Sequence, residues 1–292
     1  MKRILKIILI AAAALFLLSV LGLLGLKAFT VYQTSRLIDS IADRGYTFGA
    51  LPAVLPPADP FNGRSIDIGY ARVKTPFEKI DTISIAARLP VVVLQSGSVD
   101  IWFFVPMTCD QQLLTKYFGP EVHNPDYQPD RHDEQLKKFL RNNGSDQRFM
   151  LLHCSFPWWQ YGQSMERRSF EDLWTGDAEE INFYLMKLTL LSSPFKVNST
   201  LETDNVHAAL ELVGEHAVSC RIWDKQHRMY AEFTVRSRNR AGSLEIARQL
   251  ATTFEFTVDG IPAEDGLAHL LKQAVSVYPE YRERTPSSRS HH

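Results

Sequence analysis

The densest group of chemically versatile side chains lies between Leu151 and Gly162, where the sequence reads LLHCSFPWWQYG. Exposed aromatic rings stack on sugars or apolar ligands and anchor protein interfaces. Neighbouring side chains of an extended segment point to opposite sides, so we expect one of Trp158 and Trp159 to be exposed. Together with Tyr161, they are candidate residues for binding a partner protein or a small ligand. The alternative is a loop that closes over the core and uses both indoles as its lid.

Cys154, in the same stretch, has the chemistry of a nucleophile, but its neighbour His153 is badly placed to act as its base. The two side chains diverge in a strand, whereas a cysteine nucleophile needs a base within hydrogen-bond distance. That base would have to come from elsewhere in the fold. The chain has three cysteines, and in an oxidising compartment they allow one disulfide in any of three pairings. The favoured alternative is three buried thiols: Cys109, Cys154 and Cys220.

A second group of donor side chains lies in the segment EVHNPDYQPDRHDE, residues 121–134. His123, Asp126, Asp130 and His132 carry nitrogen and oxygen atoms of the kind that bind metal ions. The segment has neither the H-E-x-x-H spacing nor the spacing of an EF-hand loop. A metal site is one interpretation. The other is a proline-containing loop whose acidic residues favour the start of the following helix. We predict no cofactor.

Three arginines, Arg236, Arg238 and Arg240, occupy alternate positions of the segment VRSRNRAGS. At the end of a strand they would share one face and form a patch for an anion or a lipid headgroup. The alternative is a solvated strand edge, where positive charge discourages pairing with another strand.

Composition and the missing motifs exclude several classes of protein. The net charge is −1 at pH 7, and the residues after Lys6 carry 29 basic and 33 acidic side chains, which is not the footprint of a nucleic-acid-binding protein. The sequence has no Gly-rich phosphate loop, no G-x-S-x-G elbow and no Rossmann fingerprint. With 292 residues and 45% hydrophobic composition, it can form one or two domains with a genuine core.

The N-terminus predicts a membrane anchor. Residues 7–26 are uncharged and long enough for a helix to cross hydrocarbon of about 30 Å. A signal peptide is the competing interpretation, but its apolar region runs to only ~7–15 residues and ends in small residues. Lys2, Arg3 and Lys6 precede the apolar run, so the short tail is expected to stay cytoplasmic and the rest to cross the membrane. We therefore predict a single-pass protein with an extracytoplasmic domain, periplasmic if the source is bacterial.

The elements that would position these side chains alternate between strands and helices. Strands are predicted from alternating apolar residues and from hairpin turns, over residues 65–73, 82–89, 91–106 (a hairpin around Gly97), 148–156, 217–223, 229–235 and 254–258. Helices are predicted from apolar periodicity and capping side chains, over residues 29–45, 109–118 (capped by Thr108), 133–144, 178–193, 244–253 (capped by Ser243) and 263–277. Ser169 and Asp177 each begin a capping pattern.

This order of elements predicts an α+β fold with an N-terminal transmembrane helix, a mostly antiparallel sheet and helices on both of its faces, as in an α/β/α sandwich. The order hairpin, helix, strand over residues 217–258 is similar to that of PsbP-like domains; the similarity implies a fold and no function. The expected organisation is a cytoplasmic tail (1–6), the anchor (7–26), a juxtamembrane helix and Pro-rich spacer (27–60), the domain (61–278, with a candidate subdomain boundary near 145–165) and a disordered tail (279–292).

Two functional hypotheses follow. The favoured one is a membrane-anchored, non-enzymatic module that binds an envelope protein or a cell-surface component, because an anchor raises its effective concentration near neighbours. The alternative is a membrane-tethered hydrolase or metal-binding protein that uses Cys154 or the His123–Glu134 loop. The oligomeric state is left open.

Overall fold

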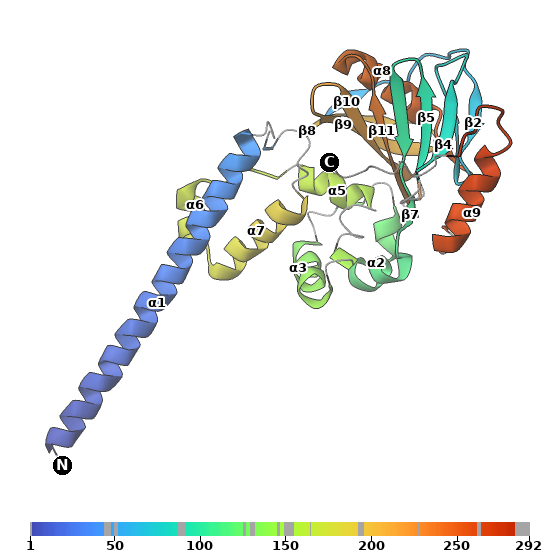
Figure 1. Cartoon of the computed structure of the whole chain (residues 1–292). Coiled ribbons are helices and arrows are strands. Elements are labelled where there is room, and N and C mark those ends of the chain that lie inside the picture. The colour runs from blue at the N-terminus through green and yellow to red at the C-terminus, as the bar shows by residue number, and fades with distance from the viewer. Residues whose placement is uncertain are drawn as a thin grey trace, which may run out of the picture.

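A mixed sheet with helices on both faces forms the centre of the computed structural model (Figure 1). The model describes residues 2–43, 48–49, 52–86, 91–124, 127–128, 132–144, 147–148, 155–163, 165–191, 196–226, 228–261 and 264–283. Strands and helices are interspersed along the chain and most strand pairs are antiparallel, which confirms the predicted α+β class.

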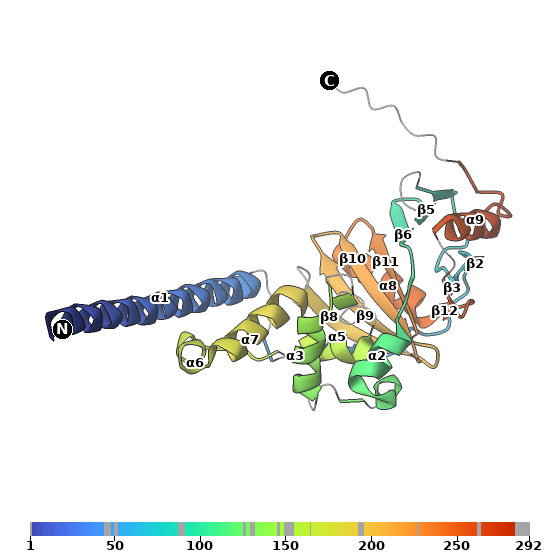
Figure 2. The ribbon, with the colours of Figure 1, turned by 90° about the horizontal axis from the view of Figure 1, so that it is seen from below.

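The chain begins with one long helix, α1 (Lys2–Asp43), which projects away from the rest of the molecule (Figures 1 and 2). Its residues from Ala12 to Leu26 are exposed, except for the half-buried Val20, and are mostly apolar, and it is the one described helix long and apolar enough to cross a membrane. The C-terminal third is different. Val31, Thr34, Ile38 and Ile41 are buried at helical spacing, because this part packs against two helices of the domain.

The main sheet follows a single path of eight strands among the described residues, with a ninth beside it. In spatial order these are β1 (Ala53–Leu55), β8 (Lys196–Glu202), β9 (Val206–Val213), β10 (Ala217–Asp224), β11 (Met229–Arg236), β6 (Val99–Phe103), β5 (Val92–Ser96) and β4 (Thr82–Ile85), and β7 (Met107–Thr108) also pairs with β11. All of these pairs are antiparallel except β1 with β8.

One face of this sheet carries the larger hydrophobic core. It is covered by α8 (Arg240–Thr252), α9 (Glu264–Val275) and a small second sheet of β12 (Glu255–Phe256), β3 (Ala71–Lys74) and β2 (Ser65–Asp67). Cys220, Ile222, Phe233 and Leu250 are fully buried there. The apolar side chains at alternate positions of the β10–β11 hairpin, such as Cys220, Ile222 and Phe233, therefore face this core.

The opposite face is covered by a layer of helices, which we call the helical layer. It consists of α2 (Gln111–Phe118), the short helix η1 (Pro120–His123), α3 (Asp133–Asn142), α5 (Phe156–Gln163), α6 (Phe170–Thr175) and α7 (Ala178–Leu191), joined by the C-terminal third of α1. In Figure 1 this layer lies below the sheet and α8 lies above it.

A row of buried polar side chains lies on the sheet face beneath the helical layer. Arg221 and Glu211, from adjacent strands, are both buried and form an ion pair at 3.3 Å. Beside them Ser219 donates a hydrogen bond of 2.7 Å to Glu232. A buried charge is tolerated only when it is paired, so this row ties β9, β10 and β11 to one register.

Several local expectations differ from the structure. The N-cap of α2 is Asp110, not Thr108, and that of α8 is Asn239, while Ser243 is buried inside the helix and donates to the His216 carbonyl. The true caps lie two and four residues from the predicted ones, and each satisfies a free N–H at the third helical position. The strand predicted over 65–73 is a hairpin of β2 and β3, because Gly69 adopts a φ of +94°.

The Pro-rich segment and the C-terminal segment are more integrated than expected. Within residues 50–60, Ala53–Leu55 form β1 on the edge of the main sheet. Near the end of the chain, Glu280 forms an ion pair with Arg64, and the backbone N–H of Arg282 donates to the Ile83 carbonyl at 2.8 Å. Residues up to 283 therefore pack on the domain, and residues 284–292 lie outside the described part.

The fold predicts a large loss of stability when Trp223 is truncated. Its side chain is fully buried between β10 and the helical layer, so Trp223→Ala should lower the free energy of unfolding by about 3–5 kcal/mol. Val277→Ala, at a side chain that is 74% exposed, should change it by less than ~0.5 kcal/mol. Urea unfolding of the detergent-solubilised full chain, followed by far-ultraviolet circular dichroism, measures both. Equal effects of the two substitutions would contradict this packing.

Candidate functional site

The two adjacent tryptophans lie on helix α5 and not in an extended segment. Pro157 occupies the first turn of this helix, where its missing N–H costs nothing. Trp158 and Trp159 are 0% and 2% exposed, so the expectation that one indole reaches the surface is wrong. Successive residues of a helix are only about 100° apart, so both rings can enter the same interior. The side chain of Tyr161 lies outside the described part.

Both indoles connect the helical layer to other elements. Trp158 packs on Phe118 of α2, with ring centroids 4.6 Å apart, and Trp159 packs on Trp223 of β10 at 5.1 Å. Phe156 stacks on His207 of β9 at 4.4 Å. These contacts leave the two indoles no free face, so in this fold they act as core side chains.

The predicted metal ligands are only partly described. Asp126 and Asp130 lie outside the described residues, as do His153 and Cys154, and of His123 only the backbone is placed, in η1. His132 precedes α3 and stacks on Tyr127, with centroids 5.0 Å apart. Within the described ranges, no group of three or more His, Cys, Asp or Glu side chains is arranged to hold a metal ion.

The three arginines of the predicted anion patch are exposed but belong to different elements. Arg236 ends β11, Arg238 lies in the following turn, and Arg240 begins α8 and donates to the Gly214 carbonyl at 3.2 Å. The premise that they share the face of one strand is therefore wrong, because the strand ends at the first of them.

The described cysteines are buried on opposite faces of the sheet. Cys109 belongs to the core of the helical layer and Cys220 to the larger core, so they do not pair with each other. Burial, with smaller contributions from Glu211 and Glu232, raises the pKa of the Cys220 thiol well above its ordinary value. A thiol in that state is a poor nucleophile.

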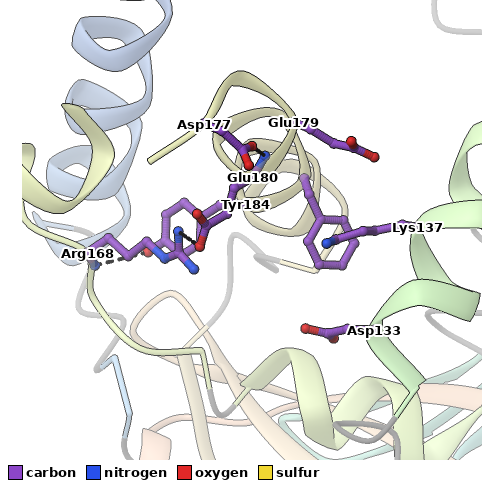
Figure 3. Close-up of a pocket in the computed structure, with 8 residues that line it drawn as sticks. Asp133, Lys137, Arg168, Asp177, Glu179, Glu180 and Tyr184 are labelled. Carbon is purple, nitrogen blue, oxygen red and sulfur yellow. Dashed lines mark hydrogen bonds and ion pairs between the residues drawn. The ribbon is translucent and has the colours of Figure 1, made fainter. Parts of the chain in front are cut away.

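Two adjoining hollows between α3 and α7 form the best candidate site on the described surface, and we call them the α3–α7 groove. The first, of about 220 Å³, is shown in Figure 3. The second, of about 560 Å³, shares Lys137, Glu179 and Phe183 with the first. Across the groove, α3 and α7 are joined by the Arg141–Glu179 ion pair at 2.6 Å.

The charges of the first hollow are largely paired with one another. Arg168 forms an ion pair with Glu180 at 2.9 Å and lies over the ring of Tyr184, as Figure 3 shows. Asp177 accepts from the backbone N–H of Glu180 and caps α7. Because most of these charged groups are already paired, the first hollow offers little charge for binding a ligand.

Lys137 stands between the two hollows. Its ammonium lies 5.2 Å from the centre of the Phe183 ring and 2.8 Å from the Glu134 carboxylate. The hydrogen bond that Lys137 donates to Glu134 raises the pKa of Lys137, and the opposing effect of burial is smaller, so the side chain is positively charged at neutral pH. It therefore places positive charge beside an aromatic ring, a combination that suits a ligand with adjacent acidic and apolar groups.

The second hollow combines an apolar floor with a cationic rim. Leu140, Phe183 and Ala178 provide apolar surface, and Lys137, Arg141 and Arg148 provide the cations. Lys137 pairs with Glu134 and Arg141 with Glu179, so Arg148 is the cation best placed to bind an added acceptor. The Arg148 Nε is buried and has no hydrogen-bond partner among the described residues. A buried guanidinium donor without a partner is costly, so an acceptor supplied from outside would stabilise it.

Nothing local in the sequence marks this groove. Its lining comes from residues 133–148 and 168–184. Most of these lining residues are charged, and in the sequence each of those is typical of an exposed helix face. One weak signal was present: α3 carries an apolar stripe of Leu136, Phe139 and Leu140 between charged residues, which implied that a second helix packs against it.

The pH dependence of the free energy of unfolding tests whether His207 is buried beside α5. Burial and the nearby Lys225 lower its pKa to about 4, and Glu202 opposes this. Folded His207 therefore stays neutral while the unfolded chain takes up a proton below pH ~6.5. The free energy of unfolding should fall as the pH drops from ~6.5 towards 4, a window in which the proton binds the unfolded state alone.

Urea titrations at several pH values measure this dependence. His207→Gln should flatten it, whereas His216→Gln, at an exposed histidine, should leave it unchanged. A slope that survives His207→Gln would show that another group is responsible.

Comparison with known proteins gives no assignment: no family model matches the chain, and no curated protein or solved structure is significantly similar to it.

Proposed function

We propose that this chain is a single-pass, membrane-anchored, extracytoplasmic binding module without catalytic activity, and that its α3–α7 groove takes a segment of another envelope protein. The observation that carries the proposal is the second hollow, where an apolar floor lies beneath three cationic side chains and the buried Arg148 Nε lacks an acceptor. Peptide-recognition grooves combine these two features, since apolar contact gives affinity and charge gives selectivity.

The chemistry of the groove indicates the chemistry of its occupant. The rim favours a carboxylate, which accepts charge-assisted hydrogen bonds from guanidinium groups. The floor of Leu140 and Phe183 favours an aliphatic or aromatic side chain. We therefore infer a partner segment in which an acidic residue lies close to a large apolar one.

The anchor supports a partner in or near the same membrane. Exposed apolar side chains surround α1 from Ala12 to Leu26, and a helix of this length is stable in lipid because all of its backbone groups bond internally. The basic residues Lys2, Arg3 and Lys6 favour a cytoplasmic N-terminus and an extracytoplasmic domain.

Reporter fusions test the orientation. Alkaline phosphatase folds only outside the cytoplasm, and green fluorescent protein exported unfolded stays dark. Expressed in a bacterial host, a C-terminal alkaline phosphatase fusion should be active and a C-terminal green fluorescent protein fusion dark. The control replaces Lys2, Arg3 and Lys6 with Glu and should lower phosphatase activity. The reverse pattern would place the domain in the cytoplasm and remove this part of the proposal.

Site-specific photocrosslinking in native membranes tests the groove. A benzoylphenylalanine at Asn182, an exposed position that lines the second hollow, should give a discrete adduct, and one at Val277 should not. Arg148→Glu should abolish the adduct, because losing a charge-assisted contact costs ~1.5–3 kcal/mol, or tenfold and more in affinity.

Arg238→Glu is the matched control, since it reverses an exposed charge remote from the groove in sequence and should leave the adduct intact. Circular dichroism confirms that both variants fold. An adduct that survives Arg148→Glu, or one that disappears only with Arg238→Glu, would show that the groove is not the binding site.

A further inference from the structure

Helix α6 carries two large aromatic side chains that lie largely outside the core. Phe170 and Trp174 are 53% and 41% exposed, and their rings stack nearly parallel, 6.3 Å apart. They lie one turn apart on the same face, while the intervening Leu173 is fully buried. A capping box between Ser169 and Asp172 fixes the start of the helix, so the two rings are held outward by a rigid element.

This aromatic pair lies beside a defined point on α1. Lys27 donates a hydrogen bond of 2.9 Å to the Gly176 carbonyl, just past the end of α6. The same ammonium lies 5.9 Å from the centre of the Trp174 ring. Figures 1 and 2 both show α6 next to α1, on the side of the domain from which the N-terminal part of α1 projects.

Lys27 is also the first charged residue after the apolar segment 7–26. At 1.5 Å per residue that segment spans about 30 Å, the thickness of the hydrocarbon core. Lys27 therefore marks the boundary between hydrocarbon and headgroups. Phe29 and Tyr32, both exposed on α1, follow within about 8 Å of it, which is roughly the depth of the headgroup region.

We propose that α6 lies in the headgroup region of the bilayer that α1 spans, with Phe170 and Trp174 inserted at the lipid–water boundary. This inference rests on the membrane anchor of the proposed function. Tryptophan is enriched at this boundary because its ring is apolar and its N–H is polar. Phe29, Tyr32 and Trp174 then form one aromatic belt contributed by two elements that are distant in sequence.

The charges of α6 favour a zwitterionic lipid surface. Glu171 and Asp172 lie on this helix and Asp177 follows it, whereas Lys27 is already engaged by Gly176 and Trp174. A cluster of free basic side chains, which would select anionic headgroups, is not found around α6 in the described residues. Insertion therefore depends on the aromatic rings.

The consequence is a fixed orientation for the domain. The C-terminal third of α1 packs on α6 and α7, and α6 rests on the lipid, so the domain has two attachments to the membrane plane. The start of α7, which lines the α3–α7 groove, follows α6 after only two residues and is held close to the headgroups.

Fluorescence quenching in vesicles tests the placement of Trp174. The full chain is reconstituted in phosphatidylcholine vesicles with nitroxide-labelled lipids, the label being either near the glycerol or near the end of the acyl chain. The shallow label should quench the wild-type chain more than the deep label. Trp174→Phe should lose most of that quenching, because Trp158, Trp159 and Trp223 are buried in the domain and the half-buried Trp102 lies on β6, a strand far from α1 in Figures 1 and 2.

A tryptophan placed elsewhere provides the matched control. Val277→Trp in the Trp174→Phe background should fluoresce without added quenching, since Val277 is exposed and closely follows α9, which lies far from α1 in Figures 1 and 2. Equal quenching of wild type and Trp174→Phe would overturn the proposal. Full exposure of Trp174 to aqueous iodide would overturn it as well, and would leave α6 as a surface for another protein.

Extraction of the same vesicles with alkaline carbonate separates this result from failure of the anchor. A chain released from the lipid would refute the anchor and the proposal together. A chain that stays integrated while Trp174 escapes the lipid quencher would refute the placement of α6 alone.

Discussion

The packing of Phe156 and Trp159 on Trp223 is the contact on which the rest of the structure depends. It joins α5 to the central strand β10, and α5 in turn packs against α7. Through α7 the same layer holds α1 and the α3–α7 groove. Trp223 can join the sheet to α5 because β10 is covered on both faces. Its successive residues Ile222 and Trp223 therefore belong to different cores. The aromatic contacts thus connect the long apolar helix α1 to a sheet with which it has little direct contact.

This connection places both proposed surfaces in one layer of the molecule. The groove and the aromatic pair of α6 belong to the helical layer, whereas the face formed by α8, α9 and the small sheet has neither. The buried Arg221–Glu211 pair lies beneath the helical layer, on the sheet face opposite the larger core. In the proposed function, binding and membrane attachment are therefore both carried by helices, and the sheet serves as their rigid support.

The sequence predicted those elements that depend on the chemistry of neighbouring residues, such as turns and helix caps. The β5–β6 hairpin follows from Gly97, which adopts a φ of +57°, and the start of α6 follows from Ser169 and Asp172. β9 was not predicted because Val206–Val213 is almost fully buried on both faces and has no alternation. Trp158 and Trp159 were misplaced because a proline ends a strand and begins a helix equally well. The groove needed tertiary structure, since α3 and α7 are distant in sequence.

The pairing of β1 with β8 has a mechanical consequence. β1 follows α1 after a short connection and joins the edge of the main sheet through a parallel ladder from Ala53 to Leu55. A pull on α1 therefore reaches the domain by two routes, through its packing on α6 and α7 and along the backbone into β1. Tension along β1 acts on the hydrogen bonds that it shares with β8, so the edge of the main sheet bears part of any force applied to α1.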